Sequence, residues 1–456
     1  MTRGFDASAH YGRRIADVHD DGITVKDPPG GADGRLAASG FPAPSELPGF
    51  PPSPSPSSSS PPSPPSPPSR SKRSLPNPKD SKDPGVPGRA PALPAVRGPI
   101  TSLLFERLAR PPHRFGLLSL PLLSFPARFA GPVLMDEDVQ LALFVCYELH
   151  HRGFEGVDDR WEWNPSLLEV REILEARFEE GLARAVPYPP AFRPEQTRQV
   201  LAELVADAVD GPDLAGFLQR QADLAQFREF VAHRSIHHLK DADPYTLAIP
   251  RLSGASKAAP VEIQADAYGG GGADLFRPTM RELGMDDSYG AYLERVPAIT
   301  LAISNTMSLF GLHRRHLGAL LGHLAAFEMT SSAPNRLCSL GLRGLGGDEA
   351  ASRFRDEHVR ADAVHEQVTA REQRAVHEQA VVHEQVATHE QIAAHEQVAA
   401  YDMCGEFATR HPSRAGDVLY GAACALTLDR LFAEHVMSHW RRGTSSLREA
   451  GAATGS

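Results

Sequence analysis

From residue 97 onward, apolar residues recur three and four positions apart along most of the chain. This spacing places them on one face of an α-helix, whereas no long run shows the alternation of a half-buried strand. The pattern therefore predicts an all-α fold, a single bundle of roughly eight to ten helices. The clearest helical runs are residues 139–149, 197–209, 218–233, 289–309 and 317–329.

Clusters of proline, glycine and aspartate separate these runs, and such residues end helices or favour turns. A further apolar stretch, residues 116–135, contains Pro121, Pro126 and Pro132. Because proline interrupts a helix, we expect a loop here rather than a membrane span. The breaks between the helical runs fall at residues 187–190, 241–244, 269–272, 333–335 and 344–347.

Both ends of the chain differ in composition from its middle. Residues 41–96 are dominated by proline and serine and hold few aliphatic side chains. Such a segment buries too little apolar surface to offset the entropy lost on ordering. We therefore expect a disordered tail at residues 1–96, a helical domain at 97–445 and a disordered C-terminus at 446–456.

Charge and cysteine usage narrow the class of protein. The formal net charge is −10, and the densest basic cluster is Arg70–Arg73, which argues against nucleic acid as a partner. The 4 cysteines form no CxxC pair, so neither a disulfide framework nor a zinc ribbon is indicated. No apolar stretch near the N-terminus resembles a signal peptide. We expect a cytoplasmic protein with reduced thiols and no membrane partner.

The segment HVRADAVH, residues 358–365, carries the clearest candidate chemistry. His358, Asp362 and His365 are spaced i, i+4 and i+7, which places two imidazoles and a carboxylate on one helix face. Mixed nitrogen and oxygen donors favour iron, manganese or zinc over calcium or magnesium. A solvated polar face on a charged helix is the alternative.

Further ligands must come from other helices. Glu328 stands in an otherwise apolar helical run, and a buried carboxylate is costly unless it is paired or binds a metal. Glu262 and Asp266, four residues apart, are a second candidate pair, or else an acidic edge facing solvent. Two more pairs, Glu148 with His151 and Glu229 with His233, are either ligands or polar contacts within the core.

A hexad repeat begins at His365: HEQVTA, REQRAV, HEQAVV, HEQVAT, HEQIAA and HEQVAA. Six residues turn a helix by 600°, so only every third histidine returns to the same face, about 27 Å further along. The repeat therefore does not form one metal stripe, although zinc buffering by its histidines is a minor alternative. We expect residues 366–400 to be an insertion that extends one helix, which protrudes, bends back or pairs as a coil with a partner or a second copy of the chain.

Several stretches resemble the iron-containing redox enzymes of the heme-oxygenase-like diiron oxidase group. The resemblance implies a heme-oxygenase-like helical bundle. In this family two irons lie between three core helices, which supply a Glu and a His, a bridging Glu, and an HxxxDxxH set. By resemblance, Glu328 is the bridging Glu, and His358, Asp362 and His365 are the third set. The resembling stretches are CYELHHRGF (146–154), FREFVAHRSIHHLKDADPYTLAIPRLSG (227–254), VEIQADAYGGG (261–271), YGAYLERVPAITLA (289–302), MSLFGLHRR (307–315), HLAAFEMTSSAPNR (323–336) and FRDEHVRADAVHEQ (354–367).

The first ligand helix departs from the family pattern. The family reads DEYGGG followed by a His, whereas this chain has Ala267 in place of the Glu and no His between His238 and His313. Asp266 or Glu262 is the candidate replacement for this carboxylate, and no nearby residue replaces the imidazole. The resemblance implies a nonheme site with one or two Fe ions.

The resemblance implies an oxidase or oxygenase that activates O2 and oxidises an unknown small organic substrate, with activity impaired by the missing ligands. The alternative is a catalytically decayed helical protein that serves as a structural or interaction module.

Overall fold

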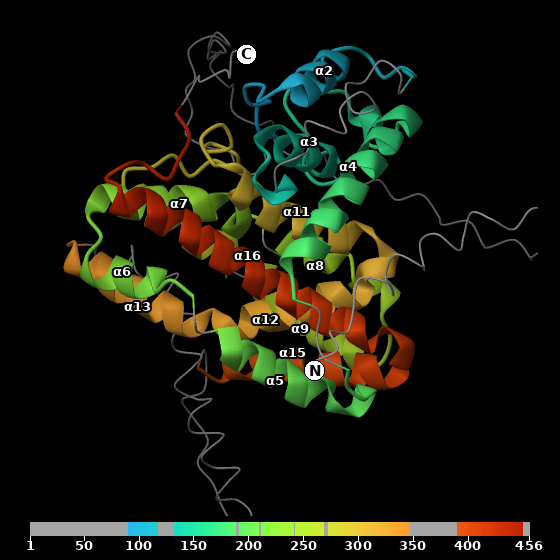
Figure 1. Cartoon of the computed structure of the whole chain (residues 1–456), viewed down its shortest axis with the longest axis vertical. Coiled ribbons are helices and arrows are strands. Elements are labelled where there is room, and N and C mark those ends of the chain that lie inside the picture. The colour runs from blue at the N-terminus through green and yellow to red at the C-terminus, as the bar shows by residue number, and fades with distance from the viewer. Residues whose placement is uncertain are drawn as a thin grey trace, which may run out of the picture. The chain divides into compact units, whose positions relative to one another are not determined.

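The computed structural model describes residues 90–116, 132–187, 191–208, 211–240, 242–268, 272–346 and 390–449. These residues form helices and connecting segments without any strand, so the predicted all-α class is confirmed (Figure 1). None of the described helices is long and apolar enough to cross a bilayer. The α-helices are α2 Pro99–Leu108, α3 Glu137–Glu148, α4 Pro165–Ala185, α5 Thr197–Asp207, α6 Leu214–Arg220, α7 Leu224–His238, α8 Ala242–Thr246, α9 Ala255–Tyr268, α10 Gly272–Glu282, α11 Ala298–Leu312, α12 Leu317–Thr330, α13 Ser332–Gly344, α15 Glu390–Arg410 and α16 Ala415–Arg441.

The described residues hold more α-helices than the eight to ten expected, because helices such as α8 and α10 lie between the predicted runs. Two of the predicted runs are also divided or shorter than expected. The run at 218–233 is split between α6 and α7, since the Asp223 carboxylate accepts a hydrogen bond from the Gln226 amide at 2.8 Å and starts a new helix. The run at 289–309 becomes helical only at Ala298, directly after Pro297. The break predicted at 333–335 lies instead in the first turn of α13, where Pro334 is tolerated because first-turn amides lack helical partners.

α12 and α16 cross at very short range and form the centre of the bundle (Figure 1). A Cβ at Gly322 would clash with the carbonyl oxygen of Val418, and a Cβ at Gly421 would clash with the carbonyl oxygen of Ala319. The two helices thus each present a glycine to the other's backbone. Because only glycine fits at such an approach, this crossing fixes the position of α12.

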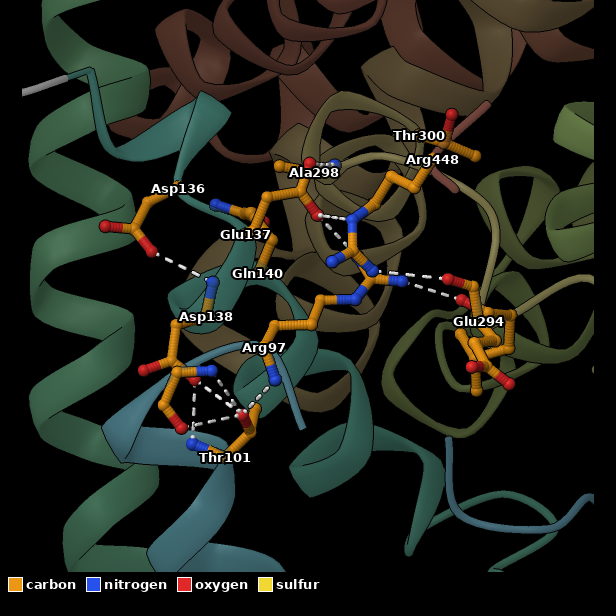
Figure 2. Close-up of polar contacts among 12 residues, drawn as sticks. Arg97, Thr101, Asp136, Glu137, Asp138, Gln140, Glu294, Ala298, Thr300 and Arg448 are labelled. Carbon is orange, nitrogen blue, oxygen red and sulfur yellow. Dashed lines mark hydrogen bonds and ion pairs between the residues drawn. The ribbon is translucent and has the colours of Figure 1, made fainter. Parts of the chain in front are cut away.

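Three consecutive acids, Asp136, Glu137 and Asp138, cap the N-termini of three different helices (Figure 2). Asp136 accepts hydrogen bonds from the first turn of its own helix, α3. Glu137 Oε1 accepts from the amide of Ala298, the first residue of α11, at 2.8 Å. Asp138 accepts from the amides of Ile100 and Thr101 in α2 at 2.7 and 2.8 Å. First-turn amides have no acceptors within their own helix, so these carboxylates serve as the acceptors. Their negative charges also interact favourably with the positive N-terminal end of each helix dipole.

Glu137 also joins the two ends of the folded chain. Its Oε2 lies 2.7 Å from Arg97 Nη1 and 3.3 Å from Arg448 Nε. The Arg97 side chain is fully buried. Burial lowers the pKa of Arg97 to about 10 although Glu137 acts to raise it. The Arg97 guanidinium still binds as a cation at neutral pH and also donates to the carbonyl of Leu293.

The ordered chain extends past both predicted domain boundaries. Ser446 was expected to begin a disordered C-terminus, yet it is 2% exposed and donates its amide and hydroxyl to Glu229 Oε2. At the other end, Pro91 is buried and accepts a hydrogen bond from the amide of Glu155. These long-range polar contacts hold short segments that composition alone does not identify as folded.

Two other sequence predictions fall largely outside the described residues. They are the disorder of residues 1–89 and the course of the hexad repeat through residue 389. The last repeat residues, 390–400, form the first half of α15, which continues without a break to Arg410. The end of the repeat is therefore part of a helix of the bundle.

We predict that Gly322→Ala and Gly421→Ala each lower the free energy of unfolding by about 1–3 kcal/mol, because each added methyl group must push the α12 and α16 backbones apart. Gly344→Ala is the matched control, since a Cβ at Gly344 meets nothing within 4 Å. Urea unfolding followed by circular dichroism measures the three values. Equal stability of all three variants would contradict a tight crossing.

Candidate metal centre

Glu328 lies in the last turn of α12, at the point where this helix leaves the core. Residues 317–326 of α12 are all buried, whereas residues 327–330 are half-buried. The carboxylate is therefore carried at the edge of the apolar interior by a helix whose position the glycine crossing fixes. A ligand on such a rigid element has a well-defined position.

α9 has a buried face, and the half-buried Ala267 lies on the same side of the helix. The buried positions Ser256, Ala259, Ile263 and Gln264 lie on one side of the helix, and at 100° per residue Ala267 falls among them. The family's first ligand position thus faces inward and holds a methyl group, which cannot bind a metal.

The two carboxylates proposed as replacements lie elsewhere on α9. Glu262 is exposed and lies about 140° around the helix from Ala267. Asp266 occupies the position directly before Ala267 in the same helix. Of the two, the position of Asp266 is closer to that of the missing ligand.

The three residues of the HxxxDxxH set, His358, Asp362 and His365, lie outside the described residues. Their convergence with Glu328 therefore stays a prediction. Within the described parts of the chain, no group of three or more His, Cys, Asp or Glu side chains is arranged to hold a metal ion.

Within the Glu148–His151 candidate pair, Glu148 forms a buried ion pair with Lys240. Glu148 is fully buried, and its Oε2 lies 2.7 Å from Lys240 Nζ and accepts a hydrogen bond from the Tyr289 hydroxyl at 2.8 Å. The Lys240 ammonium also lies 4.6 Å from the centre of the Phe144 ring. Glu148 is therefore a polar contact of the core, the second of the two possibilities that the sequence left open.

The Glu229–His233 candidate pair is bridged by Ser446. The Ser446 hydroxyl donates to Glu229 Oε2 at 2.7 Å, so its oxygen accepts from His233 Nε2 at 3.1 Å. The other ring nitrogen, Nδ1, then accepts from the Thr300 hydroxyl at 2.7 Å. This chain of hydrogen bonds leaves neither residue of the pair as a metal ligand.

A second group of buried polar side chains lies around α12 and was not predicted. The Tyr245 hydroxyl in α8 and His323 Nδ1 in α12 are 2.8 Å apart. The ring of His237 lies 5.3 Å from that of Phe327, next to Glu328 in sequence, and 5.0 Å from that of His238. The HxxxHH spacing at residues 233–238 was a visible signal for the α7 histidines, whereas Tyr245 and His323 are too far apart in sequence to form a local pattern.

Comparison with known families supports iron-based redox chemistry. Residues 228–392 match the model of a family described as iron-containing redox enzyme. No curated protein matches the chain. The match confirms the resemblance predicted from the sequence, and the all-α architecture agrees with a heme-oxygenase-like fold. The matched segment is less than half of the chain and includes α9, α12 and the HxxxDxxH set.

The ligands that the family resemblance assigns to this chain predict a site for one iron rather than two. Glu328 with His358, Asp362 and His365 supplies two carboxylates and two imidazoles, a mixture that suits a single first-row metal. Ala267 adds no donor from the buried face of α9. A second iron would have to share these four ligands or use Asp266.

Glu229 gives a pH-dependent prediction. Burial alone would raise the pKa of its carboxyl, but hydrogen bonds from Trp440, Ser445 and Ser446 outweigh burial and lower the pKa below its usual value. A carboxyl with a lowered folded pKa adds stability above its unfolded pKa, about 4.3 for Glu, and loses that stability as the pH falls through the folded pKa.

We therefore expect Glu229→Gln to be less stable than the wild-type chain at pH 7 and the difference to shrink in acid. Urea unfolding at a series of pH values measures both quantities. Glu172→Gln, an exposed change on α4, serves as the control. A stability difference that stays constant between pH 7 and pH 3 would contradict the assignment.

Proposed function

We propose that the protein is a nonheme iron-dependent oxidoreductase, an oxidase or oxygenase that uses O2 to oxidise a small organic substrate. The observation that carries this proposal is the family match over residues 228–392, which contains Glu328 and the complete HxxxDxxH set. The chemistry belongs to the site rather than to the fold, so these four side chains carry the assignment.

Each residue of the set has a defined part in the proposal. His358 and His365 would fix the position of the metal, since an imidazole binds through one nitrogen in one direction. Glu328 and Asp362 would adjust their coordination as the charge at the centre changes. The bound iron would supply the electrons and the open coordination positions that O2 chemistry needs.

The surroundings of Glu328 suit a reaction that must exclude water. α12 is buried up to Ala326, and the ring of His237 lies 5.3 Å from that of Phe327 and 5.0 Å from that of His238. The buried residues of α12 before Glu328 would limit solvent access on that side of the site and strengthen electrostatic interactions there.

A specific observation favours a second candidate, a helical protein without catalytic activity. Ala267 lies on the buried face of α9, so the vacant ligand position is not filled by Glu262, which is exposed on another side. Such a protein would act as a structural or interaction module. Measurement of the iron bound by the full chain distinguishes the two functions.

We predict that the full chain, loaded with ferrous iron without oxygen and then desalted, retains about one iron per chain, because its four remaining ligands suit one first-row metal. Glu328→Gln should lose most of this iron, whereas Glu262→Gln, an exposed change on α9, should retain it. Iron is measured by atomic emission, and the reaction with O2 by absorbance. Absence of bound iron in the wild-type chain would support the non-catalytic alternative.

Ala267→Glu tests the vacant ligand position directly. A carboxylate added to the buried face of α9 should tighten iron binding, with a dissociation constant lower by about tenfold. Ala267→Gln is the matched control, because it adds a side chain of similar size without a negative charge. Equal iron affinity of the two variants would show that α9 does not face the metal.

A further inference from the structure

A buried tyrosine–histidine pair lies at the junction of α8 and α12. The hydroxyl of Tyr245 is 2.8 Å from Nδ1 of His323, and each of the two residues is only 3% exposed. The ring of Phe310 lies 6.3 Å from that of His323. Apolar side chains thus keep solvent away from this hydrogen bond.

The protonation state of the pair follows from its burial. Burial lowers the pKa of His323 to about 4, so the imidazole is neutral at pH 7. A neutral imidazole has one acceptor nitrogen. Because a phenol is a stronger acid than a neutral imidazole N–H, the Tyr245 hydroxyl donates and Nδ1 accepts. Nδ1 is therefore placed to receive the phenolic proton.

We infer that Tyr245 is a redox-active residue that loses one electron to a strong one-electron oxidant while its proton passes to His323 Nδ1. The O–H bond of Tyr245 breaks and an N–H bond forms on the imidazole. The products are a neutral tyrosyl radical and an imidazolium, and return of one electron reverses both changes. The positive charge left by the oxidation then rests on the imidazole, because an oxidised phenol is a far stronger acid than an imidazolium, even one whose pKa burial has lowered.

The other buried tyrosine with a clear acceptor is less suited to oxidation. The Tyr289 hydroxyl donates to Glu148, but this carboxylate is already paired with Lys240. The Arg152 guanidinium also lies 4.5 Å from the centre of the Tyr289 ring. A cation over the ring opposes removal of an electron from it. Tyr289 is therefore the matched control for Tyr245.

The position of the pair links it to the proposed metal centre. His323 and Glu328 lie on the same helix, about 7.5 Å apart along its axis. A strong oxidant produced from O2 at an iron site near Glu328 would thus lie within electron-transfer reach of Tyr245. In the protein's own reaction this step rests on the proposed function, but the redox property of the pair does not.

The experiment uses the metal-free full chain, so that its outcome is independent of iron binding. A photogenerated ruthenium(III) polypyridyl complex removes one electron, and transient absorbance and electron paramagnetic resonance follow the radical. We expect a long-lived tyrosyl signal in the wild-type chain and in Tyr289→Phe, and its loss in Tyr245→Phe. In His323→Gln the radical should decay about tenfold faster, because the proton lacks its acceptor.

A signal that persists in Tyr245→Phe, or an unchanged lifetime in His323→Gln, would overturn the inference. Circular dichroism checks that each variant is folded. If a variant does not fold, electron–nuclear double resonance of the wild-type radical in D2O tests the inference instead. A coupled, exchangeable hydrogen in the hydrogen bond supports the pair, and its absence overturns it. If only the iron-loading experiment failed, the proposed function would be contradicted and the redox property of the pair would not.

Discussion

The crossing of α12 and α16 is the constraint on which the interior of this protein depends. Gly322 and Gly421 let each helix approach the backbone of the other, and no larger residue fits at either position. This contact determines the position and direction of α12 within the bundle. α12 in turn carries Glu328 at its end and His323 one turn and a half before it. The positions of the proposed iron centre and of the tyrosine–histidine pair therefore both depend on these two glycines.

The acidic triplet at residues 136–138 organises the opposite part of the fold. Its three carboxylates cap α2, α3 and α11, and Glu137 also pairs with Arg97 and Arg448 near the two ends of the folded chain. Because α11 packs against α12 and α16, the cap on Ala298 connects this polar cluster with the helices around the candidate site. The Glu229–Ser446–His233 chain then ends on Thr300, in the first turn of the same helix.

The local pattern of the sequence predicts the all-α class and most helix positions, because amphipathic spacing is a property of neighbouring residues. It also singles out Glu328, since an acid in an apolar run is unusual. α7 begins after Asp223 and α11 begins after Pro297, at positions that differ from the predicted helix starts. A cap depends on a single hydrogen bond or backbone dihedral angle, and apolar periodicity contains no information about either. The caps of Glu137 and Asp138 on other helices, and the contact of Tyr245 with His323, join distant parts of the chain. Only the tertiary structure brings such residues together.

The central proposal is that the chain holds one iron through His and carboxylate ligands, with α9 contributing no carboxylate at Ala267. X-ray absorption spectroscopy of the iron-loaded full chain tests this claim most directly, because it reports both the ligand atoms and any neighbouring metal. The account predicts nitrogen and oxygen scatterers around a single iron and no iron–iron scattering. A clear iron–iron distance would contradict it by showing that two metals assemble without a Glu at position 267.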